Sequence, residues 1–214
     1  MLGVICAMDI EAEGLIALMQ DKKKVNVIGY NFTVGSINDK DVVVVLSGVG
    51  KANAAAVTAL LISSFNVTEV INLGVCGGNI KVGTMIVADS VVQYDFDTTA
   101  IGDELGQLGG FDSPYIKCTP QMTALIGGEA RGVIASGDKF INDENSAKFL
   151  AEHFNAIGFD MESGAVAQIC TKASVKFAIV RVVSDGVDIT EYEKFKVLAA
   201  QKGVNAVVKY LGNC

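Results

Sequence analysis

Three acidic residues stand where a predicted strand gives way to a helix or a turn: Glu11, Glu162 and Asp185. Asp138 and Asp160 lie close to similar junctions. A convergence of acids without neighbouring histidines suits a reaction that has a cationic transition state and a leaving group protonated by an acid. Glycosidic cleavage has these needs, because one acid protonates the departing atom while a base orients water. Different surroundings let two carboxyl groups hold both roles near neutral pH.

Each of these acids also has a structural explanation. Asp185 could cap the helix expected from about Thr190 or shape a turn, and Glu11 could compensate the dipole of the helix that it opens. Spacing alone leaves both alternatives open. Asp160 and Glu162 precede a run of small apolar residues that would pack tightly on a sheet. Acids placed there need partners or a ligand, since an unpaired buried carboxylate costs on the order of several kcal/mol.

The element expected to position Asp185 is a strand from Phe177 to Val183 that stops at Ser184-Asp185-Gly186. Its β-branched, apolar residues are typical of a central strand that is covered on both faces. In open α/β sheets, ligands bind outside the carboxyl ends of the strands. Asp185 would therefore lie at the edge of the sheet where such chemistry gathers.

The remaining predicted elements alternate between strand and helix. Further strands are expected at Leu2–Ala7, Val25–Val34, Asp41–Leu46, Glu69–Leu73, Thr84–Tyr94, Val133–Ser136 and Ala156–Phe159. Helices are expected from Asp9 to about Met19, at Ala52–Ser63, Thr119–Gly127 and Ser146–Phe154, after Glu162 to Cys170, and from Thr190 to Leu211. This alternation predicts one domain over residues 1–214, a three-layer α/β/α sandwich with a mixed central sheet.

Two glycine-rich stretches and one long loop stand out between these elements. Ser47–Lys51 precedes a helix, and Gly74–Gly78 follows a strand, so backbone N–H groups there can approach a ligand. Neither stretch is a Walker loop or a full GxGxxG motif. Asp95–Ser113 holds four Gly and four Asp. It is too long for a plain connection, which indicates a functional or interface loop.

Composition narrows the possible partners. The formal net charge is −7, and the longest basic cluster is Lys22-Lys23-Lys24. Nucleic acids and anionic membranes require dense positive surface, so neither is expected as a partner. The apolar blocks fall short of the ~18 consecutive residues that a membrane span needs, and the N-terminus lacks a basic leader. We therefore expect a cytoplasmic protein.

The chain has one histidine, His153, and five scattered cysteines. A single imidazole leaves too few ligands for a usual zinc site, and His153 falls in a predicted surface helix, away from the acids. The cysteines suit reduced, buried thiols better than disulfides. We expect neither a metal nor a cofactor.

Seven short motifs in one order carry a resemblance to a known family. They are Ala7-Met8-Asp9-Ile10-Glu11, Ser47-Gly48-Val49-Gly50-Lys51, Asn72-Leu73-Gly74-Val75-Cys76-Gly77-Gly78, Gly106-Gln107-Leu108 within Asp95–Gly110, Ser136-Gly137-Asp138-Lys139-Phe140-Ile141, Asp160-Met161-Glu162 and Arg181-Val182-Val183-Ser184-Asp185. Nearly end to end, the chain resembles the 5′-methylthioadenosine/S-adenosylhomocysteine nucleosidases of the purine nucleoside phosphorylase and uridine phosphorylase superfamily. The resemblance implies a nucleoside phosphorylase-like fold and hydrolysis of the N-glycosidic bond of 5′-substituted adenine nucleosides.

The resemblance also implies catalytic roles. Asp185 would protonate N7 of adenine as the bond breaks, and Glu11 would activate the attacking water with help from Arg181. Glu162 would accept hydrogen bonds from the ribose hydroxyls, with Met161 against the sugar. Carboxylates near the ribose would stabilise the positive charge that develops in the transition state.

The implied binding surface is larger. Phe140 would stack on the base, the Ile141 backbone would read the adenine edge, and Tyr192 would close over the substrate. The rest of the predicted surface consists of Met8, Val49, Val75, Cys76, Gly77, Asp160 and Ser184. In a homodimer, the loop Asp95–Ser113 would complete the neighbour's 5′ pocket with Thr98, Ile101 and Gly109.

Two segments of the chain distinguish hydrolysis from phosphorolysis. A phosphorolytic enzyme needs Arg and Ser donors for its dianion. Asn72 and Val75 stand where the similar purine phosphorylases carry Arg and Ser. Met8-Asp9-Ile10-Glu11 replaces their early phosphate loop, and a carboxylate there would repel phosphate. We therefore predict hydrolysis.

Some residues depart from the nucleosidase pattern and keep other functions open. Val75 replaces a usual Ser or Thr, Asp160 a usual Glu, and Thr98, Ile101 and Gly109 stand where Val, Phe and Pro are more frequent. The alternatives are a phosphorylase, a nucleoside-binding protein without activity, and a nucleosidase for another modified nucleoside such as aminodeoxyfutalosine. Cys76 and Cys170 are predicted as core thiols, while Met8 and Met161 suit either site walls or core.

Overall fold

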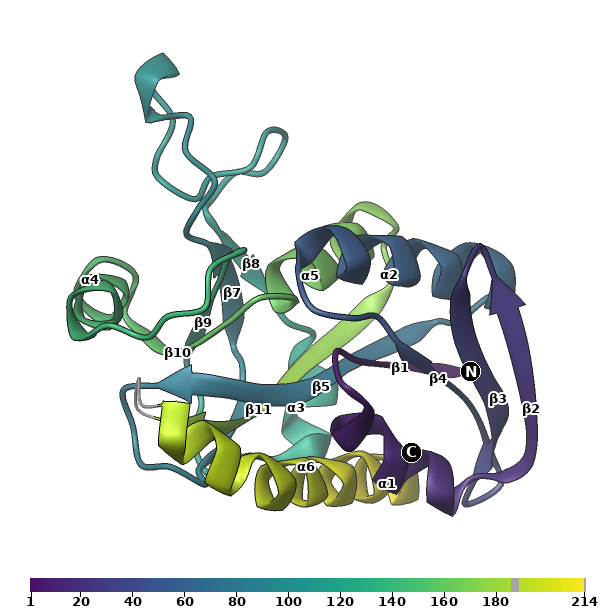
Figure 1. Ribbon diagram of the computed structural model, residues 1–214. Helices are drawn as coiled ribbons and strands as arrows, with labels where there is room; N and C mark the ends of the chain where they lie inside the picture. Colours follow the sequence, from purple (N-terminus) through teal and green to yellow (C-terminus); the bar gives the residue numbers. More distant parts are fainter. Residues whose placement is uncertain (186–188, 214) are drawn as a thin grey trace.

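The computed structural model describes residues 1–185 and 189–213, with the backbone only for residues 189–196, 198 and 199. The chain forms a single α/β domain in which a mixed sheet lies between two layers of helices (Figure 1). This confirms the predicted fold class. No described helix is long and apolar enough to span a membrane.

One mixed sheet contains all the described strands. They are β1 (Leu2–Cys6), β2 (Gln20–Val27), β3 (Tyr30–Ile37), β4 (Lys40–Leu46), β5 (Glu69–Gly78), β6 (Met85–Val87), β7 (Ser90–Gln93), β8 (Tyr115–Lys117), β9 (Val133–Ser136), β10 (Ala156–Asp160) and β11 (Lys176–Asp185). The order is β2-β3-β4-β1-β5-β10-β9-β7-β8, and β11 pairs with β5 and β6. β5 is central, because it pairs in parallel with β1 and β11 and antiparallel with β10.

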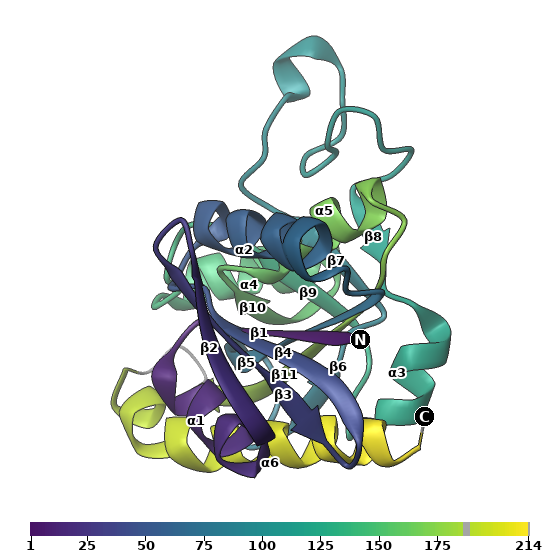
Figure 2. The same ribbon diagram turned by 90° about the vertical axis from the view of Figure 1, so that its right-hand side faces the viewer.

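Helices cover both faces of this sheet (Figures 1 and 2). α1 (Asp9–Leu18), α3 (Pro120–Ile126) and α6 (Ile189–Gly212) lie on one face, and α2 (Lys51–Phe65) and α5 (Ser163–Lys172) lie on the other. α4 (Glu144–Phe154) packs on β9 and β10. Each layer buries its apolar stripe: Val57 and Leu61 of α2 join one core, and Val204 and Val207 of α6 join the other.

α4 begins two residues earlier than predicted, at Glu144 instead of Ser146. The reason is its N-cap. The Asp143 carboxylate accepts a hydrogen bond from Ser146 N at 2.8 Å, which satisfies one of the free N–H groups of the first turn.

Three expected strands differ in the structure. Val25–Val34 is two strands, β2 and β3, because the chain turns at Ile28 and Gly29, both at positive φ. Thr84–Tyr94 is also two strands: β6 pairs with β11, while β7 pairs with β8 and β9. The strand predicted to stop at Leu73 continues to Gly78, since β11 stays paired with it through Gly77. The short strand β8 was not predicted.

The loop Asp95–Ser113 extends away from the body as an arm, and both ribbon views show it projecting beyond the helices (Figures 1 and 2). Its only described regular element is a 3-10 turn, Thr99–Ile101. Phe96, Leu108 and Phe111 pack against the core. The Ile101 side chain is 81% exposed.

Candidate active site

A cavity opens at the carboxyl ends of β1, β5, β10 and β11, where the sequence places its acids. Predicted residues that line it are Met8, Glu11, Val49, Val75, Cys76, Gly77, Phe140, Ile141, Asp160, Met161, Glu162, Ser184 and Asp185. The parallel strands β1, β5 and β11 end side by side, which brings the beginning and the last third of the chain together.

Glu11 is held by backbone donors. Its Oε2 accepts hydrogen bonds from Ala7 N at 2.9 Å and Met8 N at 3.0 Å, and its Oε1 accepts one from Val75 N at 3.0 Å. Burial raises the pKa of the Glu11 carboxyl, while Arg181 and the three N–H groups lower it. Glu11 thus caps the N-terminus of its own helix and also lines the cavity. A role in the helix and a role in the site are therefore compatible.

Glu162 occupies the N-cap position of α5, and its carboxylate reaches across to the glycine loop before α2. Its Oε1 accepts a hydrogen bond from Gly50 N at 3.0 Å, and its Oε2 lies 3.8 Å from Arg181 Nη2. Desolvation, followed by the charge of Asp160, raises the pKa of Glu162 to about 7. Arg181 and the Gly50 N–H act in the opposite direction.

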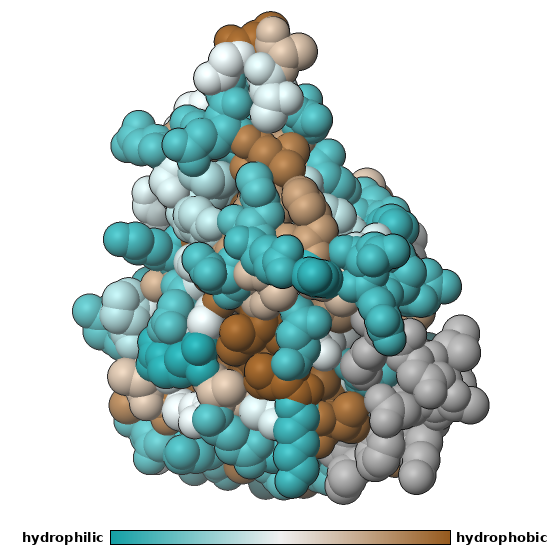
Figure 3. Space-filling model, turned by 90° about the vertical axis from the view of Figure 1, so that its left-hand side faces the viewer, coloured by the Kyte–Doolittle hydropathy of each residue, from teal (hydrophilic) through white to brown (hydrophobic). Residues whose placement is uncertain are grey.

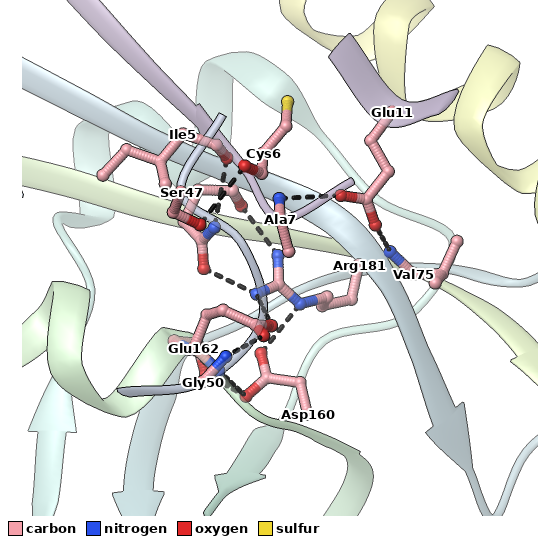
Figure 4. Close-up of polar contacts among 12 residues, drawn as sticks. Ile5, Cys6, Ala7, Glu11, Ser47, Gly50, Val75, Asp160, Glu162 and Arg181 are labelled. Atoms are coloured by element: carbon pink, nitrogen blue, oxygen red, sulfur yellow. Dashed lines mark hydrogen bonds and ion pairs between the residues drawn. The ribbon is translucent and has the colours of Figure 1, made fainter. Parts of the chain in front are cut away.

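Arg181 is not part of the cavity lining. Figure 4 shows its guanidinium beside the carboxylates of Asp160 and Glu162. Its Nε donates to Asp160 Oδ2 at 2.7 Å, and its Nη2 donates to Asn72 Oδ1 at 2.6 Å. Its Nη1 donates to the backbone carbonyls of Asn72 and Val180. The guanidinium is 1% exposed. It is therefore the buried counter-ion of the carboxylates, and its help to Glu11 in activating water stays a prediction.

Asp160 lines the cavity, but its hydrogen bonds are with protein groups. Besides Arg181, it accepts hydrogen bonds from Glu162 N, Ser163 N and Ser163 Oγ. These bonds fix the turn between β10 and α5, from which the Glu162 side chain projects. Asp160 thus carries the charge that holds Arg181 in place beneath Glu162.

Asp185 ends β11 and is 1% exposed, at the wall of the cavity. Its Oδ2 accepts a hydrogen bond from Ser184 Oγ at 2.8 Å, and Ser184 Oγ also lies 3.2 Å from the Cys76 carbonyl oxygen. When Asp185 is protonated, its O–H can donate a hydrogen bond to Ser184 Oγ. The Ser184 hydroxyl then donates to the Cys76 carbonyl oxygen instead of to Asp185. The alternative of a helix cap by Asp185 involves residues 186–188, which lie outside the described residues.

Two glycines of β5 make room for these groups. A Cβ at Gly74 would lie 2.9 Å from Glu11 Oε1, and a Cβ at Gly77 would lie 2.1 Å from a ring carbon of Phe159. Any side chain at these positions would displace the carboxylate or the aromatic wall. Close approach explains the glycine-rich sequence.

Apolar side chains surround the mouth of the cavity. Val49 and Phe140 line it and are 49% and 44% exposed. Phe149, 46% exposed, lines an adjacent hollow that shares Lys139 and Ile141 with the cavity. Figure 3 shows apolar surface gathered on one face of the molecule. The mouth offers flat and aliphatic contacts for an aromatic base.

Other predicted residues lie elsewhere. Thr98, Ile101 and Gly109 are on the arm and do not line the cavity of their own chain. Tyr192 lies in the first turn of α6, where the side chain is outside the described residues. Buried Cys170 belongs to the core, as predicted, whereas Cys76 is both buried and part of the wall.

Sequence reasoning missed Ala7, Lys139 and Phe159, which also line the cavity. Lys139 precedes the predicted residue Phe140, and Phe159 precedes the predicted residue Asp160. The sequence therefore indicated the right loop and the right strand end, but one lining residue too few in each. Ala7 contributes a backbone N–H, and its residue type gives no signal of that.

The cavity favours positive charge. Glu11, Asp160, Glu162 and Asp185 line it, and Lys139 is the one basic residue among its described lining. The Lys139 ammonium is engaged by Ser146 Oγ at 3.2 Å and Asp143 Oδ2 at 3.6 Å. Such a site stabilises a developing cation and offers buried carboxyl groups for proton transfer.

Known proteins resemble this chain in sequence and in fold. A 5′-methylthioadenosine/S-adenosylhomocysteine nucleosidase of Lysinibacillus sphaericus is 32% identical over 227 residues, covering 99% of each chain. The S-adenosylhomocysteine nucleosidase of Streptococcus pyogenes, solved with 5-methylthiotubericidin, matches with a TM-score of 0.95 and 28% identity over 99% of this chain and 96% of that one. A futalosine hydrolase of Helicobacter pylori matches with a TM-score of 0.94 and 26% identity over 100% and 97%.

The family model described as the phosphorylase superfamily matches residues 1–212. Because this model spans nearly the whole chain, and a curated relative is 32% identical over 99% of each chain, the protein belongs to the phosphorylase superfamily.

Proposed function

We propose that this protein hydrolyses the N-glycosidic bond of 5′-substituted adenine nucleosides, releasing adenine and the 5′-substituted ribose. 5′-Methylthioadenosine, S-adenosylhomocysteine and 5′-deoxyadenosine are its substrates. The observation that carries the proposal is the group of acids in one cavity, with Glu11 fixed by three backbone N–H groups. The names of the curated relatives support the same activity.

In this reaction Asp185 donates its proton to N7 of adenine as the bond between C1′ and the base nitrogen breaks. The bonding electrons leave with the base, and the ribose becomes cationic. Glu11 accepts a proton from water, whose oxygen bonds to C1′. Glu162 accepts hydrogen bonds from the ribose hydroxyls and stabilises the cation. Phe140 stacks on the base, and the Ile141 backbone reads its edge.

Water is favoured over phosphate as the nucleophile. A phosphate dianion in this cavity would meet Glu11 and Glu162, whose carboxylates repel it. Arg181 cannot receive it, because the guanidinium is buried against Asp160 and Asn72. Phosphorolysis needs such a donor in the cavity.

The decisive experiment is incubation with methylthioadenosine, adenosylhomocysteine, deoxyadenosine, inosine and uridine, with and without phosphate. We expect adenine from the 5′-substituted nucleosides at a rate that phosphate does not change. Base release that requires phosphate would make the protein a phosphorylase. Tight binding of adenine nucleosides with no base released at any pH would make it a binding protein.

The futalosine hydrolase match supports a second candidate, cleavage of another modified nucleoside such as aminodeoxyfutalosine. Adding aminodeoxyfutalosine to the panel tests it. A kcat/KM well above that for methylthioadenosine would change the assigned substrate but leave the reaction and its acids as they are.

We also propose a cytoplasmic homodimer in which the arm completes the partner's 5′ pocket. The arm extends from the body, and Ile101 at its 3-10 turn is 81% exposed, although burial of a large apolar side chain is favourable. Apolar surface at the cavity mouth is available to receive it. The buried free thiols Cys6, Cys76, Cys118 and Cys170 suit a reducing compartment.

Replacing Ile101 by Asp is expected to weaken the dimer and lower kcat/KM for methylthioadenosine by about tenfold or more, since a charge in an apolar interface core costs on the order of 2 kcal/mol. Sedimentation velocity and adenine release measure the two effects. Ile28→Asp is the matched control, because Ile28 is 77% exposed in the β2–β3 turn. A fully active monomer of the Ile101 variant would contradict the proposal.

The pH dependence of kcat/KM should report Glu162. Its pKa is raised to about 7, mainly by burial, so the free enzyme loses this negative charge as the pH falls through 7. The protonated carboxyl no longer stabilises the ribosyl cation, and we expect kcat/KM to decline on the acid side with an apparent pKa near 7. A profile that stays flat from pH 8 down to pH 5 would show that Glu162 is not needed in its charged form.

A further inference from the structure

α2 has no capping side chain of its own. Its N-cap is Gly50, at φ +102°, and no side chain of the preceding loop accepts a hydrogen bond from the first turn. Helix N-termini normally receive such an acceptor from the residue at the N-cap. Here two carboxylates from distant parts of the chain supply it: Glu162 accepts from Gly50 N at 3.0 Å, and Asp138 Oδ1 accepts from Lys51 N at 2.8 Å.

Asp138 is itself held by the root of the arm. Its backbone N–H donates to Asp95 Oδ2 at 2.9 Å, and Asp95 Oδ1 lies 2.5 Å from Lys51 Nζ. Lys51 is thereby bound twice, through its backbone by Asp138 and through its ammonium by Asp95. The Lys51 side chain is 17% exposed and that of Asp95 is 29% exposed, so solvent screens this ion pair only in part.

The same contacts continue to the other side of Glu162. Lys51 Nζ donates to Gln93 Oε1 at 3.2 Å, and Gln93 Nε2 donates to the Gly164 carbonyl at 3.1 Å. Gly164 lies in the first turn of α5, two residues after Glu162. With the Glu162–Gly50 bond, these contacts close a ring through Lys51 and Gln93. Asp138 and Asp95 are attached to this ring through the backbone N–H and the ammonium of Lys51, next to the Gly50 donor.

From this ring we propose that Asp138 is a positioning residue for the hydrolysis: it fixes the Gly50 N–H that orients the Glu162 carboxylate toward the ribose. The inference rests on the proposed function. Asp138 does not line the cavity, but it immediately precedes Lys139, Phe140 and Ile141, which do. One carboxylate therefore holds the sugar-binding loop and the base-binding loop at a fixed separation.

The test is Asp138→Ala, which removes the acceptor of Lys51 N. We expect kcat/KM for methylthioadenosine to fall by about tenfold, the effect typical of a lost positioning contact near a site. The acid limb of the pH profile should also move to higher pH. The reason is that a weakened hydrogen bond from Gly50 N lowers the pKa of Glu162 less than before. Asp160, Glu11 and Arg181 also affect this pKa, but the substitution leaves them unchanged.

Two further variants separate positioning from general loss of structure. Asp138→Asn keeps an Oδ1 that accepts from Lys51 N, so it should recover most of the activity and the wild-type pH limb. Asp89→Ala is the matched control, because Asp89 is also an exposed carboxylate, and its partner is Arg131, away from the ring. Its activity and pH profile should equal those of the wild type.

Three results would overturn the inference: wild-type kcat/KM and pH limb in Asp138→Ala, failure of Asp138→Asn to recover activity, or the same losses in Asp89→Ala. The proposed function fails in a different way, by absence of adenine release from the wild-type protein itself. Thermal unfolding of each variant distinguishes a misfolded protein from a displaced Glu162.

Discussion

Asp185→Asn is expected to reduce kcat for methylthioadenosine by about 10³-fold, within the range of 10² to 10⁴ that general acid catalysis supplies. Asn has the same shape and can still accept the Ser184 Oγ hydrogen bond, now 2.8 Å long. It has no acidic proton for N7, so the base must leave as an anion. Adenine release measured under saturating substrate gives the loss, and calorimetry should show nucleoside binding that is largely intact.

The Asp185 prediction can be tested further with a second substrate. A 4-nitrophenyl riboside has a leaving group that departs without protonation, so Asp185→Asn should cleave it nearly as well as the wild type does. Equal loss on both substrates would mean that the variant is damaged in some other way. Wild-type turnover of methylthioadenosine in Asp185→Asn would remove Asp185 as the acid.

Glu11→Gln is expected to lower kcat by a comparable amount, about 10²- to 10⁴-fold, because water loses its base. The amide has a second fault in this position. All three hydrogen bonds to the Glu11 carboxylate come from backbone N–H donors, Ala7, Met8 and Val75. The NH₂ group of Gln must face at least one of these N–H groups. Two donors then point at each other without an acceptor, and this lowers the stability of the protein as well as its activity.

The matched control is Glu13→Gln, on the same helix but exposed, and it should keep wild-type activity and thermal stability. Glu11→Ala with added azide gives a positive test. Azide is a small anion that can fill the vacated space and attack C1′. It should restore part of the base release, and the second product should be the 1-azido sugar. Normal hydrolysis by Glu11→Gln would mean that another group activates the water.

Helices and strands could be predicted from the sequence wherever the local pattern of residues is enough to fix the conformation. The apolar runs of β1 and β11 are strands because their residues are buried on both faces of the sheet. Patterns failed where a partner strand decides. β5 continues through its glycines since β11 pairs with it, and β6 and β7 separate since they pair with different strands.

The acids of the site were also readable, because strand ends are visible in the sequence and carboxylates at strand ends of an α/β sheet meet at one edge. Their surroundings were not. Besides the local donors Ala7 and Met8, Glu11 accepts from the backbone N–H of Val75, and Glu162 accepts from that of Gly50, across 64 and 112 residues of sequence. Residue type carries no record of such contacts.

The sequence by itself determined the fold class, the superfamily resemblance and most of the residues that line the cavity. Only the tertiary structure decided that Arg181 lies behind the carboxylates and that Asp138 caps α2 from a distant loop. The physical reason is that hydrogen-bond directions and desolvation depend on which strands and loops lie side by side. Burial of the Glu162 carboxyl, followed by the charge of Asp160, raises its pKa from an ordinary value of 4.5 to about 7, and both depend on the tertiary structure.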